Sequence, residues 1–140
     1  MSPIVTDFCE YYRELTPASL SRLDQIYSGD AMFIDPVHSI EGLANISDYF
    51  DNMVANINHC YFHIDQVVEA DNQAFVTWLM DFSHPKLNRG HAIELPGSTH
   101  LQFDQRIHYH RDYYDLGHMV YEQIPVLQTL IKRIKGRLSA

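Results

Sequence analysis

The chain has little cysteine. Cys9 and Cys60 are the only two among 140 residues, and they lie far apart. Such a pair provides neither the disulfide framework of a small secreted domain nor a zinc site, so we expect a reducing compartment. The chain also lacks a basic N-terminal region followed by an apolar run, and no apolar stretch approaches transmembrane length. The sequence therefore predicts a cytoplasmic protein.

Basic residues are scarce over most of the chain. Residues 1–115 contain 6 Lys and Arg against 17 Asp and Glu, a net charge of −11, whereas residues 116–140 have a net charge of +3. Phosphate backbones are bound by clustered cations, so the acidic body argues against a nucleic-acid partner. The sequence also has no glycine-rich phosphate loop, nucleophile elbow or cofactor motif, and we expect no cofactor.

The composition, with 46% hydrophobic and 20% charged residues, is that of a globular protein. Apolar residues recur at helical spacing in the first part of the chain, and they alternate with polar residues after residue 59. The sequence predicts helices over 3–15, 17–27, 43–57 and 116–138, a turn over 28–30, strands over 31–34, 37–41, 60–68, 74–83, 92–103 and 106–115, and a bulge or kink at Pro96-Gly97.

Helices followed by a meander of long strands predict an α+β fold. A curved antiparallel sheet wrapped around the N-terminal helices makes a cone with an open mouth, which naturally contains an apolar pocket. We expect one domain over residues 1–140, in which 1–115 form the cone and 116–140 a basic C-terminal extension.

Asp35 stands at the end of the first short strand, directly before Pro36. Proline stops the strand and holds the preceding residue extended. Side chains alternate along a strand, so Asp35 faces inward if Phe33 does. Inside an apolar cone this carboxylate could serve as a general base. As ordinary turn chemistry it would instead accept hydrogen bonds from backbone amides, and both interpretations are open.

Over residues 4–115 the arrangement resembles the nuclear transport factor 2-like superfamily, which includes steroid delta-isomerases and SnoaL-like polyketide cyclases. The segment DAMFIDPV is similar to the base-bearing strand end of the isomerases. Tyr11 precedes Asp35 by 24 positions, a spacing similar to that of their oxyanion tyrosine and aspartate base. HLQF at 100–103 is similar to the stretch after their second oxyanion donor, an aspartic acid whose place Thr99 takes. The resemblance implies a homodimer, with Asp35 as base and Tyr11 as oxyanion donor; Tyr11 could equally be a core tyrosine.

His108, His110, Asp112 and Tyr114 share one face of the last predicted strand. Three interpretations compete: a metal site, a His110–Asp112 pair in the cavity, and a solvated or dimer-facing strip. We favour the cavity, where a buried His and Asp must bond to each other or to water, and we expect no metal. The residues expected to bind the substrate are Phe33, Trp78, Met80, Phe82, Thr99, Leu101, Phe103 and Tyr114.

The C-terminal extension has an apolar stripe beside Lys132, Arg133, Lys135 and Arg137. Such a basic amphipathic helix could lie on an anionic membrane surface. We favour packing on the acidic domain of its own chain or of a dimer mate.

Two functions follow from these residues. The first is a cofactor-free acid–base enzyme, an isomerase, cyclase or dehydratase, acting on an apolar carbonyl-bearing small molecule through Asp35, Tyr11, His110 and Asp112. The second is a non-catalytic module that binds an apolar ligand or a protein partner. In the first, Asp35 or His110 lies within hydrogen-bond reach of a ligand; in the second, the protein caps these groups and side chains fill the cavity.

Overall fold

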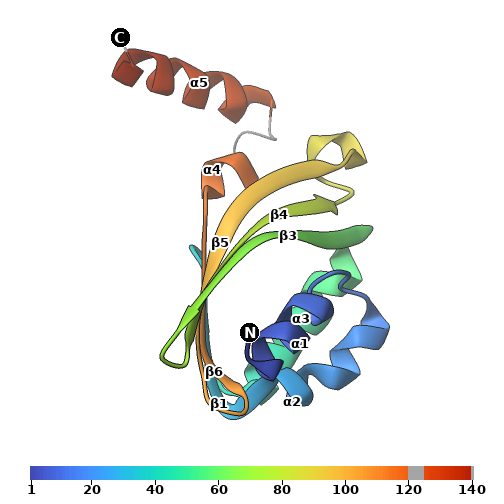
Figure 1. Cartoon of the computed structure of the whole chain (residues 1–140). Coiled ribbons are helices and arrows are strands. Elements are labelled where there is room, and N and C mark those ends of the chain that lie inside the picture. Colours follow the sequence, from blue (N-terminus) through green and yellow to red (C-terminus); the bar gives the residue numbers. More distant parts are fainter. Residues whose placement is uncertain (120–124, 140) are drawn as a thin grey trace.

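The computed structural model describes residues 1–119 and 125–139. It is an α+β structure in which a curved sheet wraps around N-terminal helices (Figure 1). The helices are α1 (Pro3–Tyr11), η1 (Pro17–Arg22), α2 (Leu23–Ile26), α3 (Leu43–Asn56), η2 (Asn88–Gly90), α4 (Leu116–Met119) and α5 (Pro125–Ser139), and the strands are β1 (Tyr27–Ile34), β2 (Ser39–Glu41), β3 (His59–Ala70), β4 (Gln73–Ser83), β5 (Ile93–Phe103) and β6 (Ile107–Tyr114).

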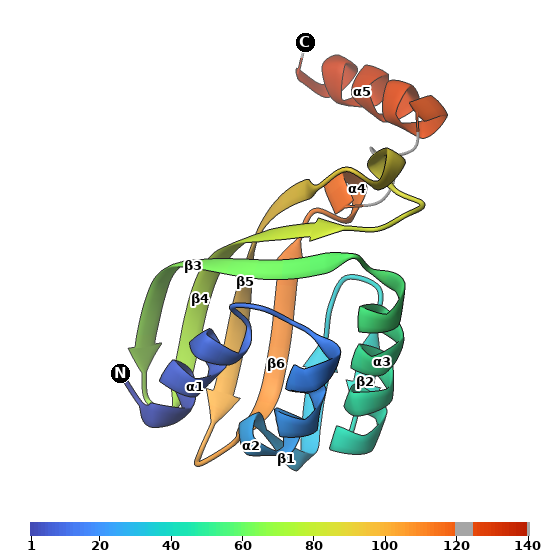
Figure 2. The ribbon, with the colours of Figure 1, turned by 90° about the vertical axis from the view of Figure 1, so that its right-hand side faces the viewer.

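The six strands form one sheet in the order β2-β1-β6-β5-β4-β3. All neighbours are antiparallel except β1 and β6, which pair in parallel and bring Phe33 opposite His110. Helices α1, α2 and α3 lie on the concave face of the sheet (Figure 2). The core lies between these layers, where side chains such as Val5, Phe50 and Leu101 are buried. The predicted cone fold is confirmed.

Two details of the first half differ from expectation. The helix predicted over 17–27 consists of η1 and α2, and η1 begins with the predicted cap, because the Thr16 hydroxyl accepts a hydrogen bond from the Ser19 amide. The turn predicted over 28–30 is wrong, since β1 already begins at Tyr27. The pairing of β1 with β6 is irregular between Tyr27 and Met32, so turn-forming residues occupy an irregular part of the strand.

The predicted bulge at Pro96-Gly97 is also wrong, because β5 continues its ladder with β4 through both residues. Gly97 faces Trp78 across the ladder and is the first residue of β5 to pair with β6, opposite Tyr114. Pro96 therefore has a strand neighbour on one side only, a position that tolerates its missing N–H.

Gly97→Ala should destabilise the protein by about 1–3 kcal/mol, the usual cost of overpacking a core. A Cβ atom at residue 97 would lie less than 3.0 Å from three atoms of the Trp78 indole, so the ring or the strand would have to shift. Gly136→Ala in helix α5 is the control, because its Cβ would meet nothing within 4 Å and alanine favours helix. Urea unfolding of both variants measures the difference, and equal stability would contradict this packing.

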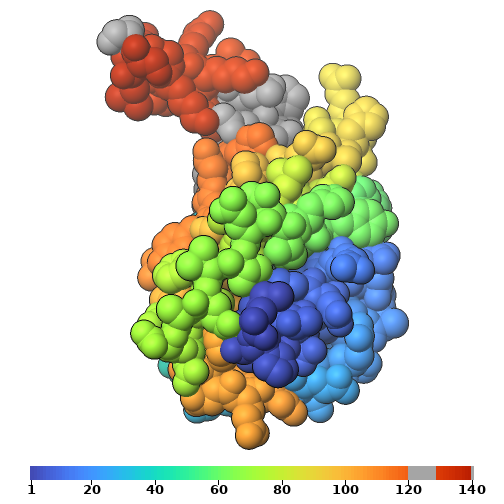
Figure 3. Space-filling view, in the orientation of Figure 1, coloured from blue at the N-terminus to red at the C-terminus, as the bar shows by residue number. Residues whose placement is uncertain are grey.

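The described parts of the helix predicted over 116–138 are α4 and α5. Pro125 is the first residue of α5, where its missing N–H leaves no helical hydrogen bond unmade. Residues 120–124 of the predicted helix lie outside the described residues. Helix α5 stands outside the cone (Figure 3), and its Leu130, Ile134 and Leu138 are exposed. The Lys135 ammonium of this helix lies 3.9 Å from the Asp115 carboxylate that follows β6, so the basic extension does contact its own acidic domain through an ion pair. The predicted homodimer stays a prediction. Among the described helices, none has the length and hydropathy needed to cross a membrane.

Candidate functional site

A hollow lies between the concave face of the sheet and helix α3. Its inner compartment has a free volume of about 50 Å³ and is lined by aromatic and aliphatic side chains together with two carboxylates, Asp35 and Asp112. An outer compartment of about 440 Å³ adjoins it, and both share Tyr49, Met53 and Met80 in their walls. A largely apolar hollow of this size with a few polar groups is typical of a small-molecule site.

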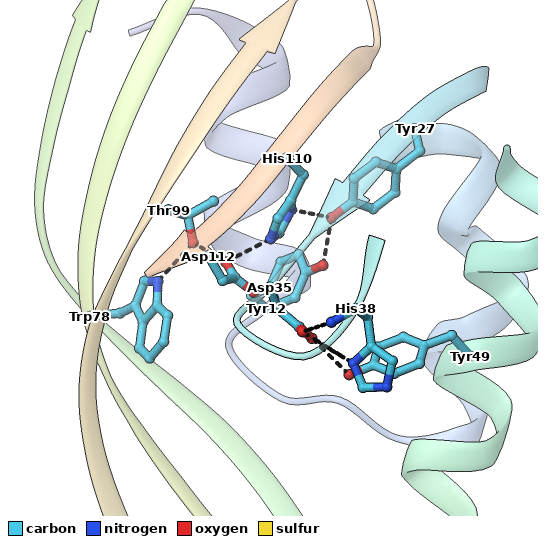
Figure 4. Close-up of polar contacts among 9 residues, drawn as sticks. All are labelled: Tyr12, Tyr27, Asp35, His38, Tyr49, Trp78, Thr99, His110 and Asp112. Atoms are coloured by element: carbon cyan, nitrogen blue, oxygen red, sulfur yellow. Dashed lines mark hydrogen bonds and ion pairs between the residues drawn. The ribbon is translucent and has the colours of Figure 1, made fainter. Parts of the chain in front are cut away.

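Asp35 lies in the wall of the inner compartment, where β1 ends, and it is 8% exposed. Its Oδ1 accepts hydrogen bonds from the backbone amides of Val37 at 2.8 Å and His38 at 2.7 Å. Its Oδ2 accepts one from the Tyr49 hydroxyl at 3.2 Å, and the His38 Nδ1 lies 3.1 Å from Oδ1 (Figure 4). Asp35 is therefore both the turn residue and a part of the cavity wall.

Asp35→Ala should lower the free energy of unfolding by about 2–6 kcal/mol, because two amides lose their acceptor and each orphaned group costs about 1–3 kcal/mol. Asp35→Asn keeps one oxygen for the amides and should cost less than half as much. Urea unfolding of both variants tests this. Equal losses would mean that the negative charge, and not the turn, accounts for the stabilisation.

His110 and Asp112 form the predicted pair on β6. The His110 ring is 1% exposed, and its Nε2 lies 2.7 Å from Asp112 Oδ1. Its Nδ1 lies 2.7 Å from the Tyr27 hydroxyl, which lies 2.5 Å from the Tyr12 hydroxyl. These four side chains form a continuous hydrogen-bonded chain from helix α1 to the sheet (Figure 4).

The same Asp112 oxygen has a second donor. The Thr99 hydroxyl donates to Oδ1 at 2.6 Å, and the Trp78 indole N–H donates to Thr99 at 2.8 Å. Within the described part of the chain, Oδ2 of Asp112 has no hydrogen-bond partner, and the side chain is 15% exposed where it lines the inner compartment. Asp112 therefore presents one occupied oxygen to the protein and one free oxygen to the cavity.

The direction of the hydrogen bonds from Asp112 to Tyr12 follows from the carboxylate at one end. An ionised carboxylate only accepts hydrogen bonds, so the His110 Nε2 must carry a proton. In the neutral ring Nδ1 is then an acceptor, and the Tyr27 hydroxyl donates a hydrogen bond to it. The oxygen of Tyr27 in turn accepts a hydrogen bond from the Tyr12 hydroxyl. The partners of His110 thus fix both its orientation and its tautomer.

Four tyrosines of the site stay protonated over a wide pH range. Burial raises the pKa of Tyr12 and Tyr27 well above the ordinary value. Burial also raises the pKa of Tyr49 and Tyr114, and the charge of Asp35 raises both further. Tyr114 lines the inner compartment, and its hydroxyl has no hydrogen-bond partner among the described residues.

The fold agrees with the comparison with known proteins. A family model described as the SnoaL-like domain matches residues 8–110. The chain belongs to this family. No curated protein matches the chain at a significant level.

Solved structures have the same fold as this SnoaL-like chain. A protein of Shewanella putrefaciens CN-32 assigned to the SnoaL-like polyketide cyclases is 20% identical, with a TM-score of 0.74 over 90% of this chain and 98% of that one. A nuclear transport factor 2-like protein of Burkholderia pseudomallei is 14% identical, with a TM-score of 0.76 over 89% and 99%. A protein of Catenulispora acidiphila with a ketosteroid isomerase-like fold, solved with trimethylamine, is 20% identical, with a TM-score of 0.72 over 88% and 93%.

In this SnoaL-like domain Tyr11 does not reach the hollow. Its ring is buried in a separate depression with Arg22 and Ile26, and burial raises the pKa of its hydroxyl to about 12. The next residue, Tyr12, faces the hollow. Adjacent residues at the end of a helix point about 100° apart, so a shift of one position exchanges cavity for periphery. The role expected of Tyr11 is therefore corrected, and Tyr114 is the tyrosine of the cavity wall whose hydroxyl has no hydrogen-bond partner among the described residues.

The predicted lining residues divide into three groups. Phe33, Trp78, Met80 and Tyr114 line the inner compartment, and Met80 and Phe82 line the outer one. Thr99 lies behind Asp112 and acts on it through a hydrogen bond. Leu101 and Phe103 are corrected to core residues, since they are 0% and 2% exposed and line neither compartment. They lie farther along β5, past the level of Asp112 on β6.

Histidine and carboxylate groups pair with each other in this domain. His110 bonds to Asp112, and His59 bonds to Asp81 at 2.7 Å. Over residues 1–119 and 125–139, no group of three or more His, Cys, Asp or Glu side chains is arranged to hold a metal ion.

Proposed function

We propose that this SnoaL-like protein binds an apolar, carbonyl-bearing small molecule and catalyses proton transfer at the carbon next to the carbonyl, without a cofactor. The observation that carries the proposal is the Asp112 carboxylate, with one oxygen held by His110 and Thr99 and the other facing an apolar cavity. A positioned carboxylate in a site shielded from water is a common general base.

The proposed step balances within the cavity. Asp112 Oδ2 removes the proton from the α-carbon, and the electrons of the C–H bond form a carbon–carbon double bond as the carbonyl oxygen becomes an oxyanion. The Tyr114 hydroxyl donates a hydrogen bond to this oxyanion. Return of the proton to another carbon completes an isomerisation. Attack of the enolate on a second carbonyl of the same molecule forms a ring and an alkoxide, and transfer of the proton from Asp112 to this alkoxide completes a cyclisation.

Asp35 has a different role from Asp112 in this proposal. Two backbone amides, His38 and Tyr49 already occupy its oxygens, so it has little capacity left to take a substrate proton. It supplies a fixed negative charge in the cavity wall. The base of the proposed reaction is thus on β6, whereas the sequence suggested the end of β1.

A non-catalytic binding module is the second candidate. The protein itself caps Asp35 and His110, which favours this reading. The open hollow and the free Asp112 oxygen favour the enzyme, because the module reading expected a cavity filled by side chains.

Deuterium exchange tests the enzyme reading without knowledge of the natural substrate. Apolar ketones with acidic α-protons, such as 1-tetralone and 2-tetralone, are incubated with the protein in D₂O and followed by proton NMR. We expect loss of the α-proton signals to be faster with protein than with buffer or with bovine serum albumin at equal concentration. If NMR shows that a ketone binds but its exchange is no faster than in these controls, the enzyme hypothesis is contradicted and the binding module is the remaining function.

A further inference from the structure

The walls of the inner compartment carry a net negative charge and many aromatic rings. Asp35 and Asp112 both line it, and the described walls of the two compartments contain no Lys or Arg. The rings of Phe33, Tyr49 and Tyr114 belong to the same wall. Aromatic faces are negative at their centres, so they attract cations as carboxylates do.

We propose that this cavity binds an organic cation, an alkylammonium head group attached to a neutral or apolar body. The inner compartment, of about 50 Å³, receives the head group, and the outer compartment, of about 440 Å³, receives the body. This binding goes beyond the proposed proton transfer and does not depend on it, since it needs the charge and the rings alone.

Asp35 is suited to such a head group because its charge is fixed in position. Its side chain is 3% exposed and is bound by the backbone amides of Val37 and His38 and by the Tyr49 hydroxyl. A carboxylate held in this way cannot turn toward solvent. A charge interaction across a low-dielectric cavity is stronger than one at the surface, so a cation gains more here than at exposed acids.

Two histidines face the same carboxylates. His38 contacts Asp35 and His110 contacts Asp112, and a proton on either ring would offset one of the two negative charges. The cavity is therefore most attractive to a cation when both rings are neutral. The binding test is therefore run at pH 8.

Choline and 3,3-dimethylbutan-1-ol provide the probe and its control. They have the same shape and the same hydroxyl group, and only choline is charged. Trp78 is the only tryptophan and lines the inner compartment, so its fluorescence reports binding, with amide NMR shifts as a second readout. We expect choline to bind at least tenfold more tightly than the alcohol at pH 8.

Variants locate the charge that produces this preference. Asp35→Asn and Asp112→Asn should each weaken choline binding at least fivefold and leave the alcohol unchanged. Asp30→Asn removes the same charge from a fully exposed position on β1, the strand that Asp35 follows, and it should change the affinity for neither ligand. Equal affinity for choline and the alcohol, or an equal loss in Asp30→Asn, would overturn the proposal. Where Asp35→Asn fails to fold, Asp112→Asn decides alone.

Discussion

Asp112→Asn should slow the protein-dependent exchange of ketone α-protons by about 10²–10⁴-fold, the range that a general base contributes. The amide keeps the shape of the carboxylate and an oxygen for the Thr99 hydroxyl, but it cannot accept a proton. Exchange rates by NMR, at saturating ketone, measure this loss in the chemical step.

The variant has a matched control. Asp104→Asn removes one carboxylate from the exposed turn between β5 and β6, so it has the same effect on net charge and should leave the exchange rate unchanged. Thermal unfolding of Asp112→Asn separates lost chemistry from a lost fold. Unchanged exchange in a folded Asp112→Asn protein would exclude Asp112 as the base.

A steep loss of stability above pH 10 is the second large effect that we expect. Tyr12 and Tyr27 are 4% and 1% exposed, and burial raises the pKa of both hydroxyls. In the unfolded chain they ionise near pH 10, so above this pH the unfolded state loses protons that the folded state keeps. The two tyrosines make their full contribution to the free energy of unfolding below pH 10. The free energy of unfolding should then fall by about 1.4 kcal/mol per pH unit for each tyrosine, or about 3 kcal/mol per unit for the pair.

Absorbance at 295 nm and far-UV circular dichroism measure this transition together. Ionisation of the two buried tyrosines should coincide with loss of secondary structure. Tyr27→Phe should flatten the alkaline slope by about 1.4 kcal/mol per pH unit, because one ionising group is gone. It should also lower stability at pH 7 by about 1–3 kcal/mol, since Tyr12 and His110 lose a buried partner. Complete tyrosine ionisation while the protein stays folded would contradict the burial of the Tyr12 and Tyr27 hydroxyls.

Local sequence was sufficient for some of the site. Asp35 before Pro36 gave a turn aspartate as one of two interpretations, and the structure has two backbone amides bonded to its carboxylate. His110 and Asp112 are two residues apart on one strand, so strand alternation placed them on the same face, and they bond there. These inferences depend on neighbouring residues alone.

Long-range pairing determined what the sequence could not. Tyr27 meets His110 because β1 and β6 pair in parallel, and no local pattern indicates which strands of a sheet become neighbours. Tyr11 was expected in the cavity because of its spacing to Asp35, and this spacing does not show which of two adjacent tyrosines faces the hollow. A register error of one residue was enough to name the wrong tyrosine.

A crystal structure with bound 2-naphthol tests the central claim most directly, because this planar phenol resembles the enol that proton transfer would form. We expect its oxygen in the inner compartment and its ring extending into the outer one, with its hydroxyl donating to Asp112 Oδ2 and accepting from the Tyr114 hydroxyl. Naphthol bound elsewhere on the protein, or bound in the hollow with its oxygen away from Asp112, would contradict a reactive carboxylate at this position.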